Sequence, residues 1–275
     1  MTNLIKCIIA AGVGFFMLLV APILVQISLE AILNELLIVV VTQPQFSSGI
    51  DLFSLFYPLW RAIGYVAGIV LIVIIPSIYK GKKWTMKVEL TAYAIPSVSG
   101  MFMFLPFISF VGGFPIPLII CFVGLIGFWS VFIFHKYDSL LEKIVNLVTF
   151  TFIGMIATHA FIIGIAAQRM LLTRAAAPLF DGLEWWILTL SGEVNWIALL
   201  MLFISIPLLT ERKKNGWWLA LVAALIVVSI DIPTQIIRIK TLDYLMGAIL
   251  AAILLVLLLI FKIRLINEDQ NNIRD

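Results

Sequence analysis

Cysteine, histidine and charge are all scarce in this chain of 275 residues. Its two cysteines, Cys7 and Cys121, lie in separate apolar runs, which predicts neither a disulfide framework nor a thiolate metal site. The only histidines are His135 and His159, so a multi-histidine metal site is excluded, and we expect neither a metal nor a cofactor. Charged residues make up 12% of the chain, and no polar stretch is long enough to fold as a separate soluble domain.

Motifs with a known chemical mechanism are missing too. The sequence contains no Walker A loop, no GxSxG, no HExxH and no paired aspartates of a metal-dependent lipid phosphotransferase. The formal net charge of +3 does not indicate nucleic-acid binding, because in an apolar chain the distribution of Lys and Arg matters for orientation instead. The sequence alone therefore indicates no reaction.

Long uncharged runs are what the chain does contain. Apolar residues make up 63% of it, and the mean hydropathy is +1.16. Residues 90–111 and 114–134 are two uncharged runs joined through Gly112 and Gly113. About 20 apolar residues in a helix cross a hydrocarbon core of about 30 Å. These runs predict a transmembrane hairpin and hence an all-α, polytopic membrane protein in contact with a lipid bilayer.

Eight transmembrane helices are expected along the chain. We read residues 1–265 as a single multi-pass membrane domain and residues 266–275 as a polar cytoplasmic tail. The first apolar run is too long for a signal peptide, so we expect it to be a retained helix. An interfacial segment is expected to follow residue 29. The predicted spans are 7–29, 59–79, 90–111, 114–134, 144–167, 185–209, 217–230 and 245–261.

The basic residues predict how these helices are oriented. With the N-terminus inside, 13 of the 18 Lys and Arg residues fall on the inner segments and 5 on the outer ones. The positive-inside rule therefore places both termini in the cytoplasm. Short loops without long soluble extensions suggest the cytoplasmic membrane of a prokaryote.

Two basic turns resemble each other. Residues 80–84 and 212–218 each lead through tryptophan into the next helix, which fits two halves, 1–137 and 138–265. The alternative is that positive charge and interfacial tryptophan recur wherever a helix meets the cytoplasm.

Three ionisable residues fall within the predicted spans, where charge is costly and often functional. Arg61, His159 and Glu193 all lie in the predicted outer half, so they are candidate residues for binding a substrate at one polar site. Each has a simpler explanation. Arg61 could anchor at the headgroups beside Trp60, and His159 could hydrogen bond to a neighbouring helix. Glu193 belongs to the polar run 191–195, where the helix either breaks or first begins.

Prolines and glycines punctuate the predicted hairpin. Pro96 and Pro106 lie in its first helix, and Pro115 and Pro117 lie at the start of the second. One interpretation is a broken helix whose freed carbonyls bind ions or substrate. The other is ordinary kinked packing, since glycine and proline are common in membrane helices.

Three functional hypotheses follow. The favoured one is a permease-like protein for a small solute or lipid, with an outward-facing polar cavity lined by Arg61, His159 and Glu193. The second is a scaffold or accessory subunit that packs against another membrane protein. The third is an intramembrane lipid-modifying enzyme using Glu193 and His159 as an acid/base pair.

Overall fold

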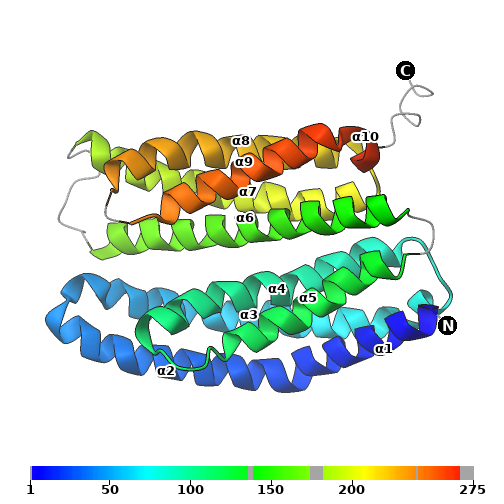
Figure 1. Ribbon diagram of the computed structural model, residues 1–275. Coiled ribbons are helices and arrows are strands. Elements are labelled where there is room, and N and C mark those ends of the chain that lie inside the picture. The colour runs from blue at the N-terminus through cyan, green and yellow to red at the C-terminus, as the bar shows by residue number, and fades with distance from the viewer. Residues whose placement is uncertain (1, 136–138, 174–181, 240, 267–275) are drawn as a thin grey trace. The chain divides into compact units, whose positions relative to one another are not determined.

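A computed structural model describes residues 2–135, 139–173, 182–239 and 241–266, and every regular element within them is helical (Figure 1). In these residues, seven helices are long and apolar enough to cross a membrane, and an eighth apolar helix, Pro117–Ile133, is shorter. The predicted all-α polytopic bundle is therefore confirmed. The expected polar tail lies almost entirely outside the described residues, as does part of the loop before residue 182.

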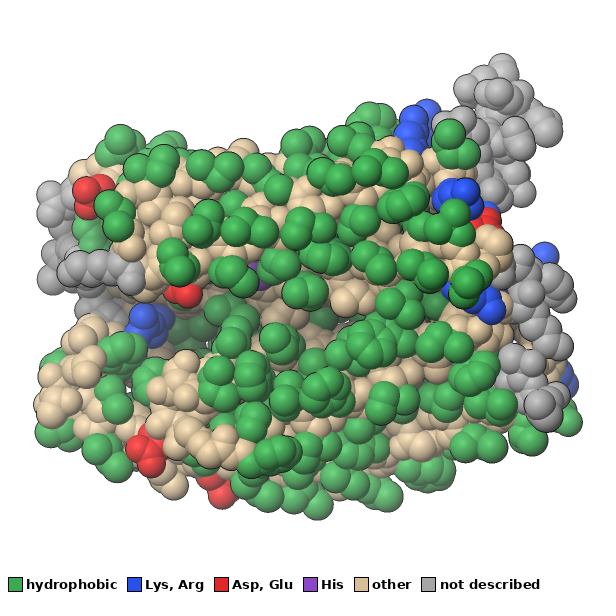
Figure 2. Space-filling model, viewed as in Figure 1, with side chains coloured by type: hydrophobic (Ala, Val, Ile, Leu, Met, Phe, Trp, Pro, Cys, Tyr) green, Lys and Arg blue, Asp and Glu red, His purple; other side chains and the backbone are tan. Residues whose placement is uncertain are grey.

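The chain divides into two compact units. Unit 1 comprises Met1–Phe134 and Arg169–Ala176, and unit 2 comprises His135–Gln168 and Ala177–Asp275. The single membrane domain and the two halves expected from the sequence both remain predictions, as does an internal repeat. Figure 2 shows hydrophobic side chains over most of the visible flank of each unit. Such flanks suit contact with lipid acyl chains.

Unit 1 opens with a helix much longer than expected. The segments α1 (Thr2–Phe15), η1 (Phe16–Val20) and α2 (Ala21–Thr42) follow one another without a break. The π-helical turn η1 directly precedes Pro22, which has no N–H to continue the α-helical ladder. The expected change to an interfacial segment after residue 29 does not interrupt the helix.

Three more helices complete most of unit 1. After the short η2 (Pro44–Phe46) come α3 (Ser47–Tyr79), α4 (Thr85–Phe110) and α5 (Pro117–Ile133). The helix α4 runs through Pro96 and Pro106, so these prolines do not divide it. Its turn into α5 contains Gly112 and Gly113 at φ values of 73° and 72°, a conformation that favours glycine.

Small residues bring α4 and α5 close together. A Cβ at Gly124 would meet the backbone nitrogen of Ser97, and one at Gly127 would meet the ring of Tyr93. These glycines are three residues apart and so do not form a GxxxG motif, and their spacing alone gave no prediction of a helix contact. In the structure they serve the same purpose as that motif, because they let two helices approach closely.

Unit 2 is built from four long helices and one short one, namely α6 (Leu140–Thr173), α7 (Leu183–Thr210), α8 (Lys214–Ile237), α9 (Asp243–Ile260) and α10 (Lys262–Leu265). The helix α7 continues through the polar run 191–195, so neither expected alternative, a break or a start at that point, occurs. The helix α8 continues past Pro233 and ends seven residues later than predicted.

Basic residues join the helices at one end of unit 2. Arg212, in the turn between α7 and α8, donates to Glu142 at the start of α6, with 3.4 Å between Nη2 and Oε1. Trp217 donates through Nε1 to the carbonyl of Leu258 at 2.9 Å, and Lys262 lies over its ring. The opposite end of the unit, where α8 passes into α9, is the one nearer the site described next.

Candidate functional site

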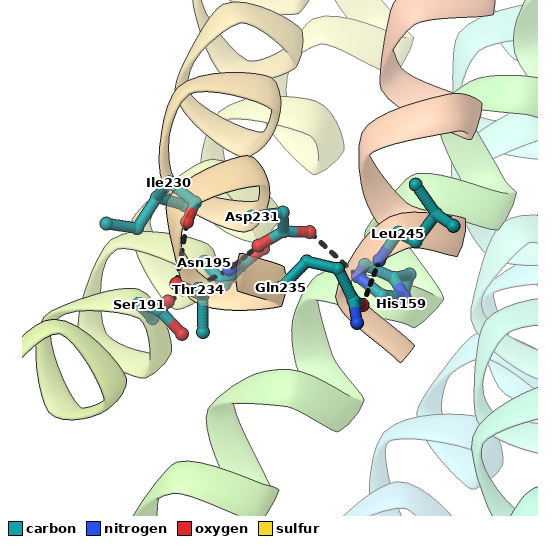
Figure 3. Close-up of polar contacts among 8 residues, drawn as sticks. All are labelled: His159, Ser191, Asn195, Ile230, Asp231, Thr234, Gln235 and Leu245. Carbon is teal, nitrogen blue, oxygen red and sulfur yellow. Dashed lines mark hydrogen bonds and ion pairs between the residues drawn. The ribbon is translucent and has the colours of Figure 1, made fainter. Parts of the chain in front are cut away.

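A buried carboxylate occupies the interior of unit 2. Asp231, on α8, has an exposed fraction of 0%. Its Oδ2 lies 3.0 Å from Nε2 of His159 on α6, and its Oδ1 accepts a hydrogen bond of 3.0 Å from the side-chain amide of Asn195 on α7 (Figure 3). Three helices thus bring one acid, one imidazole and one amide together. We call these three residues the Asp231 cluster.

The orientation of the Asn195 amide is set by two acceptors. Its Nδ2 donates to Asp231 and also to the carbonyl of Ser191, one turn earlier on α7, at 2.9 Å. Both acceptors require an N–H donor, so the NH₂ group of the amide faces them and Oδ1 points in another direction. Among the described residues this Oδ1 has no hydrogen-bond partner, although Asn195 is fully buried. A buried acceptor without a donor is costly and calls for an explanation.

Two buried hydroxyl groups belong to the same region. Tyr244, on α9, is 2% exposed, and its hydroxyl lies beside that of Ser191 on α7. Neither oxygen makes a hydrogen bond of good geometry to another part of the chain that the structure describes. Together with Asn195 Oδ1, they add uncharged acceptor groups to the region around the carboxylate.

A glycine on α9 leaves room for the acid–imidazole pair. A Cβ at Gly247 would overlap both Nε2 of His159 and Oδ2 of Asp231. Any larger residue there would therefore displace the imidazole, the carboxylate or both. The contact between His159 on α6 and Asp231 on α8 therefore depends on a glycine at position 247 of α9.

The end of α8 is fixed by a side chain near the cluster. Gln235 donates through Nε2 to the carbonyls of Arg238, at 3.0 Å, and Thr241, at 2.6 Å. Its Oε1 accepts from the backbone N–H of Leu245 on α9 at 2.8 Å. These bonds satisfy backbone groups at the end of one helix and the start of the next, which holds Asp231 and Gly247 in register.

The cluster lies toward the end of α8 that is farther from the basic turn. With a rise of 1.5 Å per residue, Asp231 lies about 26 Å from the start of α8 at Lys214 and about 9 Å from its end at Ile237. The basic turn with Arg212 is therefore far from the cluster. An acid–imidazole pair inside an apolar helical unit is costly and is often functional.

The three residues singled out by sequence lie in different surroundings. His159 belongs to the cluster, with its side chain 12% exposed. Glu193 is exposed on α7, whereas Asn195, two residues later, is buried. Arg61 lies in unit 1, where its Nη1 donates to Oε1 of Gln26 at 2.8 Å, and Gln26 donates in turn to Glu30. A common site for all three stays a prediction.

Sequence reasoning missed Asp231, because the predicted span 217–230 ends one residue before it. It also missed Glu89, on α4 of unit 1, which is 2% exposed and was placed just outside the predicted span. One feature of the sequence could have drawn attention to Asp231. It directly follows a long apolar run, and only one residue, an isoleucine, separates it from Pro233. No three His, Cys, Asp or Glu side chains among the described residues are grouped so that they could hold a metal ion.

Comparison with known proteins found no matching family model, no similar curated protein and no similar solved structure. The class of the protein therefore comes from the chain itself. The apolar helices define a multi-pass membrane protein, and unit 2 buries an acid–imidazole pair among them.

Proposed function

We propose that this chain is a permease-like protein for a small polar solute, with its binding site at the Asp231 cluster. The observation that carries the proposal is the 3.0 Å contact between Asp231 and His159 inside an apolar helical unit. Ionisable groups in membrane helices are costly and commonly mark the path of a substrate or an ion.

The unpartnered acceptor favours a binding site over a purely structural contact. A polar network that serves only to join helices is most stabilising when every member is satisfied. Here the buried Oδ1 of Asn195 lacks a donor among the described residues. A bound solute with N–H or O–H groups would supply one. A scaffold has no need for such an unfilled acceptor. The enzyme hypothesis paired His159 with Glu193, but the carboxylate that contacts His159 is that of Asp231, and Glu193 is exposed.

Uptake into proteoliposomes tests this function. Vesicles containing the wild-type chain, Asp231→Asn or Ser229→Ala would be given a mixture of ethanolammonium, glycine, xylitol and sulfate. Ser229 is a matched control on the same helix, because its hydroxyl is exposed and bonds only to its own helix at Ile226. We expect at least one probe to enter wild-type and S229A vesicles clearly faster than D231N vesicles, because intramembrane ionisable groups commonly mark a substrate path. Equal, background uptake in all three would contradict a permease and leave the scaffold hypothesis in its place.

We further propose that the protein lies in a prokaryotic cytoplasmic membrane with both termini inside. The support is the excess of Lys and Arg on the predicted inner segments. Under this orientation the Asp231 cluster lies in the outer half of the membrane.

Cysteine labelling of intact cells tests the orientation. Lys82 and Phe114 are exposed at opposite ends of the segment that contains α4, and the native Cys7 and Cys121 are both buried. A membrane-impermeant maleimide should label Phe114→Cys but not Lys82→Cys until the cells are opened. The reverse pattern would overturn the proposed orientation.

A further inference from the structure

We infer that the Asp231 cluster is a single-cation site, at which a small monovalent cation replaces the proton carried by His159 as the counter-charge of Asp231. The inference rests on the proposed function and names the class of its solute. The cation is either an alkali metal ion or the head of a primary ammonium compound, because both need the same oxygen acceptors.

The balance of charge is the first argument. Asp231 is fully buried, and its carboxylate contacts one imidazole and one neutral amide. A neutral imidazole can still donate a hydrogen bond, but it leaves the buried negative charge without a counter-charge, which is costly. One positive charge therefore balances the Asp231 carboxylate, whether that charge is a proton on His159 or a bound cation.

The acceptors are the second argument. Asn195 Oδ1 is buried and has no partner in the described chain, and the hydroxyls of Ser191 and Tyr244 lie in the same region. Figure 3 shows Asn195 and Ser191 on one side of Asp231, with His159 on the other. A cation on the Asn195 side would meet carboxylate, amide and hydroxyl oxygens, which are hard ligands suited to small cations. His159, whose side chain is 12% exposed, would then be the group that gives up its proton.

The charges around the cluster are the third argument. The other charged or titratable groups nearby are Tyr244 and Asp243 of α9 and Arg238 of α8; on α7 the cluster residues Ser191 and Asn195 are uncharged, and Glu193 of that helix is exposed. The α7 residues of the cluster therefore supply no counter-charge for Asp231.

Proton release from the purified full-length chain in detergent tests the inference. A pH indicator in weakly buffered solution would follow additions of sodium chloride or methylammonium chloride, with choline chloride as the control for ionic strength. The measurement would span pH about 5 to 8, where imidazole ordinarily changes its charge. We expect the wild type and Ser229→Ala to release up to about one proton per chain with one or both probes.

Asp231→Asn and His159→Gln should release none beyond the choline control. Release with sodium alone would assign a metal cation, and release with methylammonium alone an ammonium compound. A wild type that releases no proton with either probe would overturn the inference, and so would undiminished release from folded D231N.

The two proposals fail in different ways. Proton release in detergent without solute uptake into vesicles would keep the cation site and refute the permease. Uptake of xylitol or sulfate without cation-dependent proton release would keep the permease and refute the cation site.

Discussion

The two fully buried carboxylates in the described chain, Glu89 in unit 1 and Asp231 in unit 2, have different partners. Glu89 lies about 6 Å along α4 from its start at Thr85, near the ammonium group of Lys6. Asp231 is several turns from the basic turn of its unit and contacts an imidazole.

The difference separates two uses of buried charge. A lysine ammonium ordinarily stays charged up to about pH 10, so the partner of Glu89 is a lasting counter-charge. The imidazole beside Asp231 gains and loses its charge near neutral pH in ordinary peptides. Burial alone therefore does not identify a site, whereas burial beside a partner that can change its charge does.

The largest effect is expected from Gly247→Ala. The added Cβ would overlap His159 and Asp231, so the pair must separate, at a cost of about 1–3 kcal/mol typical of overpacking. Thermal unfolding followed by tryptophan fluorescence should show a lower midpoint, and cation-dependent proton release should be lost. The control is Gly154→Ala on α6, whose new Cβ would meet nothing within 4 Å. Equal behaviour of the two variants would show that the pair tolerates displacement.

A similar loss of stability without loss of the site is expected from Gly127→Ala in unit 1. Its Cβ would overlap the ring of Tyr93, which forces α4 and α5 apart at a comparable cost of about 1–3 kcal/mol. Gly12→Ala is its control, since a Cβ there meets no atom within 4 Å. The thermal midpoint should fall in G127A alone, while proton release per folded chain stays at the wild-type level. Loss of proton release in folded G127A would show that the site depends on packing in unit 1.

The smallest effect is expected from Glu89→Gln. The substitution keeps the shape of the side chain and removes its charge near the end of α4, where Lys6 can turn toward water. We expect a smaller shift of the thermal midpoint than in G247A, and unchanged proton release and solute uptake. An effect on release as large as that of D231N would mean that both buried carboxylates take part in cation binding.

The class of fold was predictable from the sequence because uncharged runs of more than 20 residues have few other structures available. Helix ends were less predictable. Pro233 has the appearance of a stop signal, yet α8 continues to Ile237, and Gln235 there bonds to the start of α9. Tertiary contacts of this kind override local preferences.

Of the two ionisable residues of the site, only His159 was predictable from the sequence. His159 was identifiable because it is the single ionisable residue in its apolar run. Its partner Asp231 is 72 residues away, and no local pattern connects the two. Glu193 and Asn195 show the same limit on one helix, because residues two apart differ by about 200° in direction, so only one of them can face the interior.

Nitrogen NMR of the two histidines in lipid bilayers would test the central claim most directly. With only His135 and His159 in the chain, ¹⁵N-histidine labelling gives two sets of ring signals, and His135→Gln assigns them. We predict that sodium or methylammonium converts the His159 ring from its imidazolium to its neutral form, and that Asp231→Asn abolishes this response. A His159 signal that ignores both cations, or that responds equally without the Asp231 carboxylate, would contradict the account.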